Sequence, residues 1–314
     1  MRRCLFCYKV LDSGESDFHA ACSRKMFGQS TPPELNYTED QMDELARQVI
    51  QSQSAVTGVQ PKISLHLATA DNPNGPKKLT IVGLWGGYIL KPATPYYPHL
   101  PEVEDLTMHL AELAQISTVP HSLIRLKSGN LAYITKRVDR SKKTKLLMED
   151  MCQLTNRLTE HKYKGSYEQV AKAIAQYSDN PGIDIINFYE QVLFSFLTGN
   201  ADMHLKNFSL LKQPSLGYGL CPAYDMVATA LVNPADDEDM ALTLNGRKKK
   251  IRRNDFIVAF STLKLDAKQQ KNIFDKMLRS LPAWEEMIQN SFLPEEIKVG
   301  YVKLLQRKFY DLGY

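Results

Sequence analysis

The chain of 314 residues lacks an apolar run approaching the roughly 18–20 residues that a membrane-spanning helix needs. Its N-terminus, from Met1 to Cys4, also lacks the apolar core of a secretory signal. Internal repeats and low-complexity tracts are absent, which excludes a repeat array. We therefore expect a globular protein in the cytoplasm, where its five cysteines stay reduced.

The composition is that of an ordinary globular protein, with 43% hydrophobic and 24% charged residues. A chain of this length can bury the core of one large domain or of two lobes. The net charge of +4 is small. It suits an anionic ligand such as a nucleotide, but it does not require a nucleic acid partner.

The first segment carries four residues with the spacing of zinc ligands: Cys4, Cys7, His19 and Cys22. Thiolate and imidazole groups suit a closed, tetrahedral structural site. A segment of about thirty residues has too little core to fold alone, and a metal would supply the missing stability. The alternative is that these are reduced buried thiols with His19 at the surface. Catalysis is not expected here, because a four-ligand site leaves no open position.

A polar loop that contains Gly58 precedes a segment in which Ile63, Leu65 and Leu67 alternate with polar residues, which predicts a half-buried strand. Such a loop can place backbone N–H groups against phosphates. It matches neither a Walker A motif nor the usual three-glycine kinase loop, so a plain connecting loop is the alternative.

Lys91 is predicted to end a strand, and Glu104 is predicted to lie in the first turn of a helix at 102–116. The lysine can contact nucleotide phosphates and pair with Glu104, as in protein kinases. The alternatives are a solvated lysine and a carboxylate that stabilises the helix dipole. Segments 81–84 and 88–90 are predicted to form a hairpin around Gly86-Gly87.

Asp202 and Asn207 have the Asp-x-x-x-x-Asn spacing of a protein-kinase catalytic loop. In that loop the Asp accepts a hydroxyl proton and the Asn binds magnesium. The spacing alone is common by chance. Asp225, eighteen residues after Asn207, supplies the second metal-binding carboxylate that such a site requires.

Strands dominate before about residue 150 and helices after it. The last part of the chain is predicted to form helices at 255–262, 267–280, 283–290 and 294–310. The basic run at 247–253 is interpreted either as a contact for an anionic substrate or a partner's DNA, or as a solvated hairpin after the Asn245-Gly246 turn.

Taken together, the chain resembles the HipA family of bacterial serine/threonine kinase toxins. Six motifs carry the resemblance, in the family's order: 57–62, 89–92, 135–140, 149–154, 199–209 and 222–225. The resemblance implies an α+β, two-lobed, protein-kinase-like fold with a small β-rich N-lobe and a larger all-helical C-lobe. It divides the chain into a Cys/His segment at 1–35, an N-lobe at 36–150 and a C-lobe at 151–314.

The resemblance also implies ATP and Mg²⁺ as cofactors and assigns roles by position. Asp202 would be the catalytic base, and Asn207 and Asp225 would hold magnesium. Lys206 and His204 would lie beside the transferring phosphate, where Lys206 stabilises developing charge. The remaining residues implied to contact ATP are Lys91 at the phosphates, Glu149 and Met151 at the adenine, and Thr57, Gly58, Val59, Gln60 and Lys62 in the Gly-rich loop.

The sequence departs from the full-length family pattern in three places. It is shorter at the front, which resembles the HipT type, whose missing subdomain is a separate protein, HipS. The family's inhibitory autophosphorylation serine is replaced by Ala55, so that Thr57, with Ser54 one position off, becomes the expected phosphorylation site. The Cys/His segment is not a general family feature.

The function expected from the resemblance is that of a toxin kinase that phosphorylates a translation component such as an aminoacyl-tRNA synthetase. Its expected partners are a HipB-like antitoxin, which would link it to DNA indirectly, and a HipS-like protein; no membrane partner is expected. Two alternatives stay open: a catalytically weak module that binds an antitoxin–DNA complex, and a small-molecule kinase on the same fold.

Overall fold

The computed structural model describes residues 2–42, 44, 62–68, 77–82, 86–141, 144–233, 235 and 237–314. Ser54, Thr57, Gly58, Val59 and Gln60 of the predicted Gly-rich loop therefore lie outside the described residues. The chain divides into two compact units. Unit 1 comprises Met1–Asp105, Val119–Val138 and Asn290–Phe292, and unit 2 comprises Leu106–Thr118, Asp139–Gln289 and Leu293–Tyr314.

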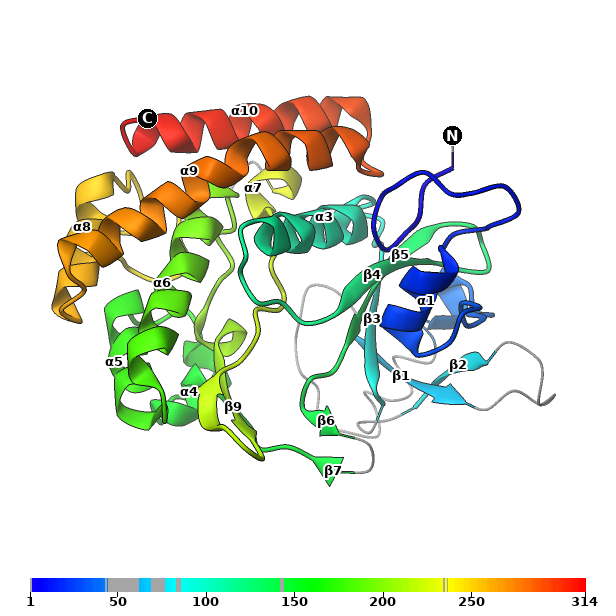
Figure 1. The fold of residues 1–314 in the computed structure, drawn as a ribbon, viewed down its shortest axis with the longest axis horizontal. Coiled ribbons are helices and arrows are strands. Elements are labelled where there is room, and N and C mark those ends of the chain that lie inside the picture. The colour runs from blue at the N-terminus through cyan, green and yellow to red at the C-terminus, as the bar shows by residue number, and fades with distance from the viewer. Residues whose placement is uncertain are drawn as a thin grey trace. The chain divides into compact units, whose positions relative to one another are not determined.

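Unit 1 is built on an antiparallel five-stranded sheet with the order β2-β1-β3-β5-β4 (Figure 1). Its strands are β1 Ile63–Ala68, β2 Lys78–Ile81, β3 Tyr88–Pro92, β4 His121–Arg125 and β5 Leu131–Lys136. The core side chains Ile63, Leu90 and Ile134 lie opposite one another on neighbouring strands and are buried. The alternating pattern that predicted the first strand therefore places Ile63 and Leu65 in the core, while Leu67 is half-buried.

The hairpin predicted around Gly86-Gly87 is wrong, because β1 lies between β2 and β3 and pairs with both. Gly86 is instead a point of close approach. Its N–H donates to the Ser64 hydroxyl at 3.0 Å, and a Cβ there would overlap Ser64 and the Leu65 backbone. The glycine thus serves packing against β1 and not a tight turn.

The N-terminal segment, residues 2–28, packs on this sheet and ends in helix α1 (Ala20–Phe27). The Leu5 carbonyl accepts from the Leu123 N–H at 3.2 Å, and the Tyr88 hydroxyl donates to the Met26 carbonyl at 3.3 Å. The segment is therefore part of unit 1. Helix α3 (Leu100–Leu113) begins in unit 1 and continues into unit 2.

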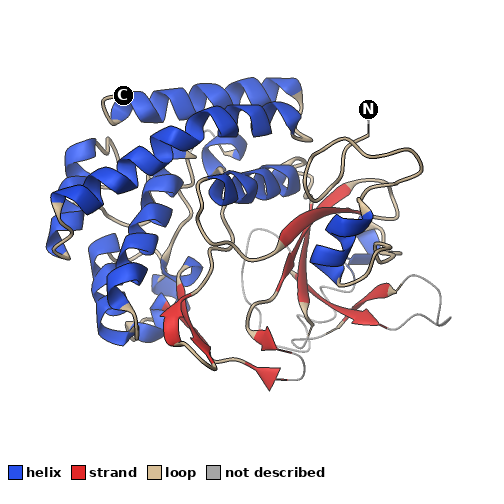
Figure 2. Ribbon diagram, in the orientation of Figure 1, coloured by secondary structure: helices blue, strands red, loops and turns tan. Residues whose placement is uncertain are grey.

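Unit 2 is mainly helical and carries a small antiparallel sheet with the order β10-β9-β8 (Figure 2). Its helices are α4 Met151–Leu154, α5 Tyr167–Tyr177, α6 Pro181–Leu197, α7 Thr229–Val232, α8 Arg253–Thr262, α9 Ala267–Asn290 and α10 Glu295–Asp311, with short 3-10 turns η1 Thr159–His161 and η2 Leu205–Asn207. Its strands are β6 Arg140–Ser141, β7 Thr144–Lys145, β8 Met148–Asp150, β9 Ser209–Gln213 and β10 Gly217–Leu220.

Local signals predicted several of these elements. The capping box of α5 is present, since the Ser166 hydroxyl accepts from the Gln169 N–H at 3.2 Å. The two helices predicted at 267–280 and 283–290 form one helix, α9, with Pro282 inside it. Among the described residues, no helix combines the length and hydrophobicity that crossing a bilayer would require.

Candidate active site

The loop that carries Asp202 follows directly after the buried helix α6. Gly199 has φ +66° and faces Leu304 and Ala230 so closely that a Cβ would overlap both side chains. Only glycine satisfies both the left-handed backbone and this packing. The next residue, Asn200, is fully buried and accepts the Asp202 N–H at 3.2 Å. The loop is therefore held by its own side chains as well as by α6.

Asn207 is joined to Asp202 by a hydrogen bond that sets the direction of its amide. The Asn207 Nδ2 donates to the Asp202 carbonyl at 2.9 Å, and the side chain is buried. Because the nitrogen faces the loop, the amide oxygen Oδ1 points away from this bond. An amide oxygen is a ligand that Mg²⁺ accepts, so Asn207 can act in the predicted role.

Tyr224 connects the segment of Asp225 to the same loop. Its hydroxyl donates to the Lys206 carbonyl at 2.9 Å and lies 2.6 Å from the Ser209 hydroxyl, on either side of Asn207 in the chain. Asp225 itself has φ +60°, a left-handed backbone that is uncommon for aspartate. Such strained positions concentrate at functional sites. Tyr224 belongs to the motif at 222–225, but the sequence indicated no role for it.

His204 is buried between these acidic residues. Burial lowers the pKa of His204, and the nearby Lys162 lowers it further, while the carboxylates of Asp202 and Asp225 oppose the shift. Burial is the largest of these effects, so we expect a neutral imidazole at pH 7. Its Nδ1 has no hydrogen-bond partner among the described residues. His204 can therefore hydrogen bond to a bound group without adding charge.

Tyr163 is a further contact of the candidate base that the sequence did not reveal. Its hydroxyl donates to Asp202 Oδ1 at 2.6 Å, and its ring meets the His204 ring edge-on with centroids 5.0 Å apart. Tyr163 lies 39 residues before Asp202, so no short spacing could have signalled the contact.

Lys206 is engaged in an ion pair. Its Nζ lies 2.6 Å from Asp150 Oδ2, and Asp150 also caps α4 through the Gln153 N–H. The predicted role of Lys206 at the transferring phosphate therefore competes with this carboxylate. Lys206 is 31% exposed, which leaves the ammonium accessible to an anion.

The two residues predicted to meet adenine lie in and after the edge strand β8. Glu149 lies opposite Leu210 of β9, and the fully buried Met151 donates its N–H to the Phe208 carbonyl at 3.0 Å. The Met151 N–H is thus already bonded within the protein. The Glu149 carboxylate accepts from the Tyr218 hydroxyl at 3.4 Å.

Unit 1 contains the predicted lysine. Lys91 Nζ lies 2.5 Å from Glu104 Oε1, with side-chain exposures of 5% and 2%, and 5.3 Å from the centre of the Tyr133 ring. The pairing of Lys91 with Glu104 is therefore present, and Lys91 is not a solvated strand-end lysine. Lys62, just before β1, is exposed.

Comparison with known proteins assigns the chain to a family. A model of the HipA-like C-terminal domain matches residues 54–285, which is most of the chain. The chain belongs to this family. Among curated proteins, the putative kinase Y4dM of Sinorhizobium fredii is 30% identical over 211 residues, covering 63% of this chain and 50% of that protein. A putative kinase of Haemophilus influenzae is 26% identical over 210 residues, covering 63% and 59%. The chain thus spans little more than half the length of these relatives.

Two solved structures share the fold. HipA of Shewanella oneidensis MR-1, in a complex with HipB and operator DNA, matches with a TM-score of 0.69 and 21% identity over 97% of this chain and 80% of that one. The proinflammatory kinase CtkA of Helicobacter pylori matches with a TM-score of 0.56 and 15% identity over 80% and 93%. The predicted α+β, HipA-like fold is therefore confirmed.

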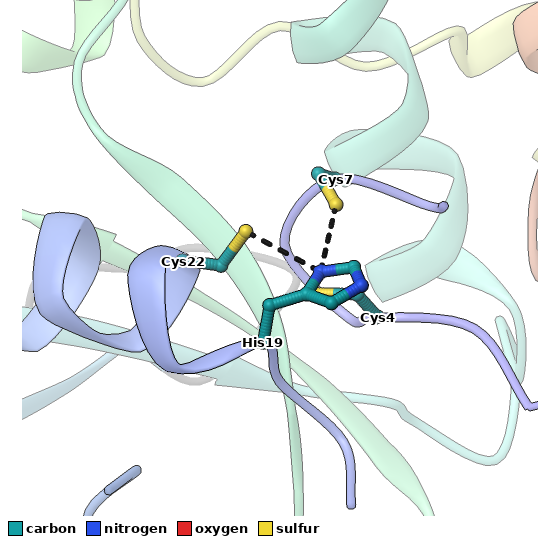
Figure 3. A group of neighbouring side chains, drawn as sticks. All are labelled: Cys4, Cys7, His19 and Cys22. Carbon is teal, nitrogen blue, oxygen red and sulfur yellow. Dashed lines mark hydrogen bonds between the residues drawn. The ribbon is translucent and has the colours of Figure 1, made fainter. Parts of the chain in front are cut away.

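The Cys/His cluster, defined as Cys4, Cys7, His19 and Cys22, lies outside the residues that the HipA-like family model matches. The four predicted ligand atoms all lie within 4.8 Å of one another (Figure 3). The structure therefore brings together the residues that spacing alone had grouped.

The basic run of this HipA-like chain is largely neutralised by nearby carboxylates. The pairs, each within 4.0 Å, are Arg247–Asp255, Lys248–Glu238, Lys249–Asp237 and Arg252–Asp311. The turn predicted at Asn245-Gly246 is present, because Leu244 and Arg247 exchange backbone hydrogen bonds of 2.7 and 2.9 Å. These pairs favour the interpretation of the run as a local, solvated network.

Proposed function

We propose that the protein is an ATP-dependent protein kinase in which Asp202 accepts the proton of a serine or threonine hydroxyl. The observation that carries the proposal is that hydrogen bonds hold the segments of Asp202, Asn207 and Asp225 together in unit 2. The Asn207 amide donates to the Asp202 carbonyl, and the Tyr224 hydroxyl joins the segment of Asp225 to Lys206 and Ser209. The curated relatives named as putative kinases support the same activity.

The oxygen ligands offered by Asn207 and Asp225 suit Mg²⁺, which prefers carboxylate and amide oxygens. A bound Mg²⁺ would neutralise the charge that develops on the phosphate oxygens. Asp202 has an independent task, which is to orient the attacking hydroxyl and take its proton. The Tyr163 hydroxyl donates to Oδ1 of that carboxylate, and Oδ2 would be the oxygen that takes the substrate proton. In unit 1, Lys91 would contact ATP phosphates with Glu104 as its partner.

For the biological role, we propose a toxin of a HipBST- or HipBA-like system that modifies a translation component such as an aminoacyl-tRNA synthetase. A HipB-like antitoxin is the proposed partner and the link to DNA. The similarity to a HipA that was solved with HipB and operator DNA supports this part. A HipS-like partner and autophosphorylation at Thr57 or Ser54 rest on the sequence resemblance, and both phosphorylation sites lie outside the described residues.

Phosphoproteomics after brief expression tests the proposal and identifies the substrate. The wild type should phosphorylate one or a few proteins on serine or threonine, and Asp202→Asn should abolish this signal. Asp275→Asn, in a surface ion pair of α9, is the matched control and should behave as the wild type. If the wild type binds ATP but no protein gains phosphate beyond the Asp202→Asn background, the protein-kinase proposal fails, and a binding module or a small-molecule kinase remains.

A further inference from the structure

The geometry of the Cys/His cluster is that of a tetrahedral metal site. His19 Nδ1 lies 3.4 Å from Cys7 Sγ and 3.7 Å from Cys22 Sγ. With Zn–S and Zn–N bonds of about 2.3 and 2.05 Å at tetrahedral angles, the N···S separation is about 3.6 Å. The observed separations bracket this value, and all four ligand atoms lie within 4.8 Å of one another. A single ion therefore fits among them.

The imidazole of His19 is oriented for ligation by a contact on its other side. Its Nε2 lies 3.0 Å from the Val10 carbonyl, which can only accept, so Nε2 carries the proton. The lone pair of Nδ1 then faces the sulfurs (Figure 3). A backbone carbonyl on the remote nitrogen is the usual way in which proteins fix a metal-binding histidine.

The backbone of the N-terminal segment presents the ligands in two pairs. Cys4 and Cys7 flank a tight turn, in which the Tyr8 N–H donates to the Cys4 carbonyl at 2.9 Å. His19 immediately precedes α1, and Cys22 lies in its first turn. Cys4 is buried, so the cluster is closed on the side of the sheet.

We propose that the Cys/His cluster binds one Zn²⁺ ion in a closed structural site, and that this ion fixes the N-terminal segment to the sheet and to the start of α3. Four protein ligands leave no open position, so the site is not catalytic. Three thiolates and one imidazole also favour Zn²⁺ over the oxygen-seeking Mg²⁺ of the kinase site. The inference does not depend on the proposed kinase activity.

The connection to α3 runs through the residue that follows the second cysteine. Tyr8 has φ +60°, and its buried hydroxyl donates to Asp105 Oδ2 at 2.8 Å. The other oxygen of Asp105 lies 2.7 Å from His121 Nδ1 on β4. Asp105 is the neighbour of Glu104, the partner of Lys91. The turn that carries Cys4 and Cys7 therefore anchors, through Tyr8, the part of α3 that presents Glu104 to Lys91.

Metal analysis of the full chain, purified without chelators, tests the site directly. The wild type should contain one zinc per chain, and a mercurial reagent that modifies the thiols should release it. Cys7→Ala and Cys22→Ala should lose the zinc. Cys221→Ala, at a buried cysteine outside the cluster, should retain it. Zinc below about a tenth of an equivalent in the wild type, iron in its place, or equal zinc in the Cys7→Ala variant would overturn the proposal.

Two measurements on the wild type keep the test independent of whether the variants fold. Exchange of the ion for Co²⁺ should give the intense visible bands of a tetrahedral site together with thiolate-to-metal charge transfer, and absence of these bands contradicts the geometry. Chelation should increase hydrogen exchange in peptides from the start of α3 and from β4, and leave α8 unchanged. Unchanged exchange at α3 after complete metal removal would refute the anchoring role.

Discussion

The buried ion pair of Lys91 and Glu104 makes a strong prediction about stability. Both side chains are at most 5% exposed and their charged atoms lie 2.5 Å apart. Removing one member breaks a buried ion pair, and breaking such a pair costs about 3–5 kcal/mol. We therefore expect Glu104→Gln and Lys91→Met each to lower the free energy of unfolding by about this amount. The double variant Lys91→Met/Glu104→Leu removes both members of the pair and should recover most of the loss.

Denaturant unfolding at pH 7 measures these differences, with Lys271→Met as the matched control. Lys271 pairs with Asp275 on the surface of α9, where the lysine is 70% exposed, and such a pair is worth at most about 1 kcal/mol. The recovered double variant should still fail to transfer phosphate, because it lacks the proposed ATP-contacting lysine. This outcome would separate the structural role of Lys91 from its role in nucleotide binding.

The reasoning would be refuted if Glu104→Gln cost no more than Lys271→Met, because the carboxylate would then act only as a charge near the start of α3. It would also be refuted if the double variant were less stable than both single variants. A double variant that is stable and fully active would remove Lys91 from the proposed site.

Three further predictions concern single side chains. Burial, with a smaller contribution from a neighbouring acid, raises the pKa of Glu102 to about 7. The folded protein therefore holds that proton more tightly than the unfolded chain, and the free energy of unfolding should fall by up to about 3 kcal/mol as pH rises from about 4.5 to 7. In Glu102→Gln, the midpoint of denaturant unfolding should no longer fall over this pH range. A variant whose midpoint falls with pH as steeply as that of the wild type would contradict the prediction. Tyr163→Phe removes the hydroxyl that orients Asp202, so steady-state kinetics should show kcat lowered about tenfold at most and the KM for ATP unchanged. A higher KM with normal kcat would contradict this role. Tyr224→Phe leaves the Lys206 carbonyl without its donor and should cost about 1–2 kcal/mol in thermal unfolding, and half-maximal activity should need a higher Mg²⁺ concentration. A variant as stable as the wild type would show that this bond does not hold the segment.

The features that could be predicted from sequence are those whose signal is local. The capping box at Ser166, the turn at Asn245-Gly246 and the alternation in β1 each depend on residues fewer than about eight positions apart. The Cys/His cluster was predictable for a similar reason, because each pair of ligands is fixed by one turn of the chain. In all of these the backbone geometry follows directly from the spacing.

The features that the sequence did not reveal depend on contacts between distant segments. Strand β1 separates β2 from β3, although 81–84 and 88–90 are neighbours in sequence, because strand order is decided by the packing of the whole sheet. The contact of Tyr163 with Asp202 spans 39 residues, and that of Lys206 with Asp150 spans 56. No pattern within a short stretch of sequence indicates such pairs, so these contacts became visible only in the structure.

Helix α9 continues through Pro282, although a proline inside a helix usually kinks or ends it. The sequence predicted two helices, at 267–280 and 283–290, on either side of Pro282. Proline removes one backbone donor and crowds the preceding turn. The helix nevertheless continues to Asn290. Trp284 and Ile288, both fully buried, lie beyond the proline. The burial of these side chains offsets the local cost of the proline, which a propensity argument does not include.

The central claim is that Asp202 serves phosphate transfer with Asn207 and Asp225 as metal ligands. The most direct measurement is transfer from γ-labelled ATP to protein in a lysate, with Mg²⁺ present or removed by a chelator. The proteins compared are the wild type, Asp202→Asn, Asn207→Ala and the control Asp275→Asn in the surface ion pair of α9. We predict Mg²⁺-dependent labelling by the wild type and the control, and none by the other two. Labelling that persists in Asp202→Asn, or that is indifferent to Mg²⁺, would contradict the account.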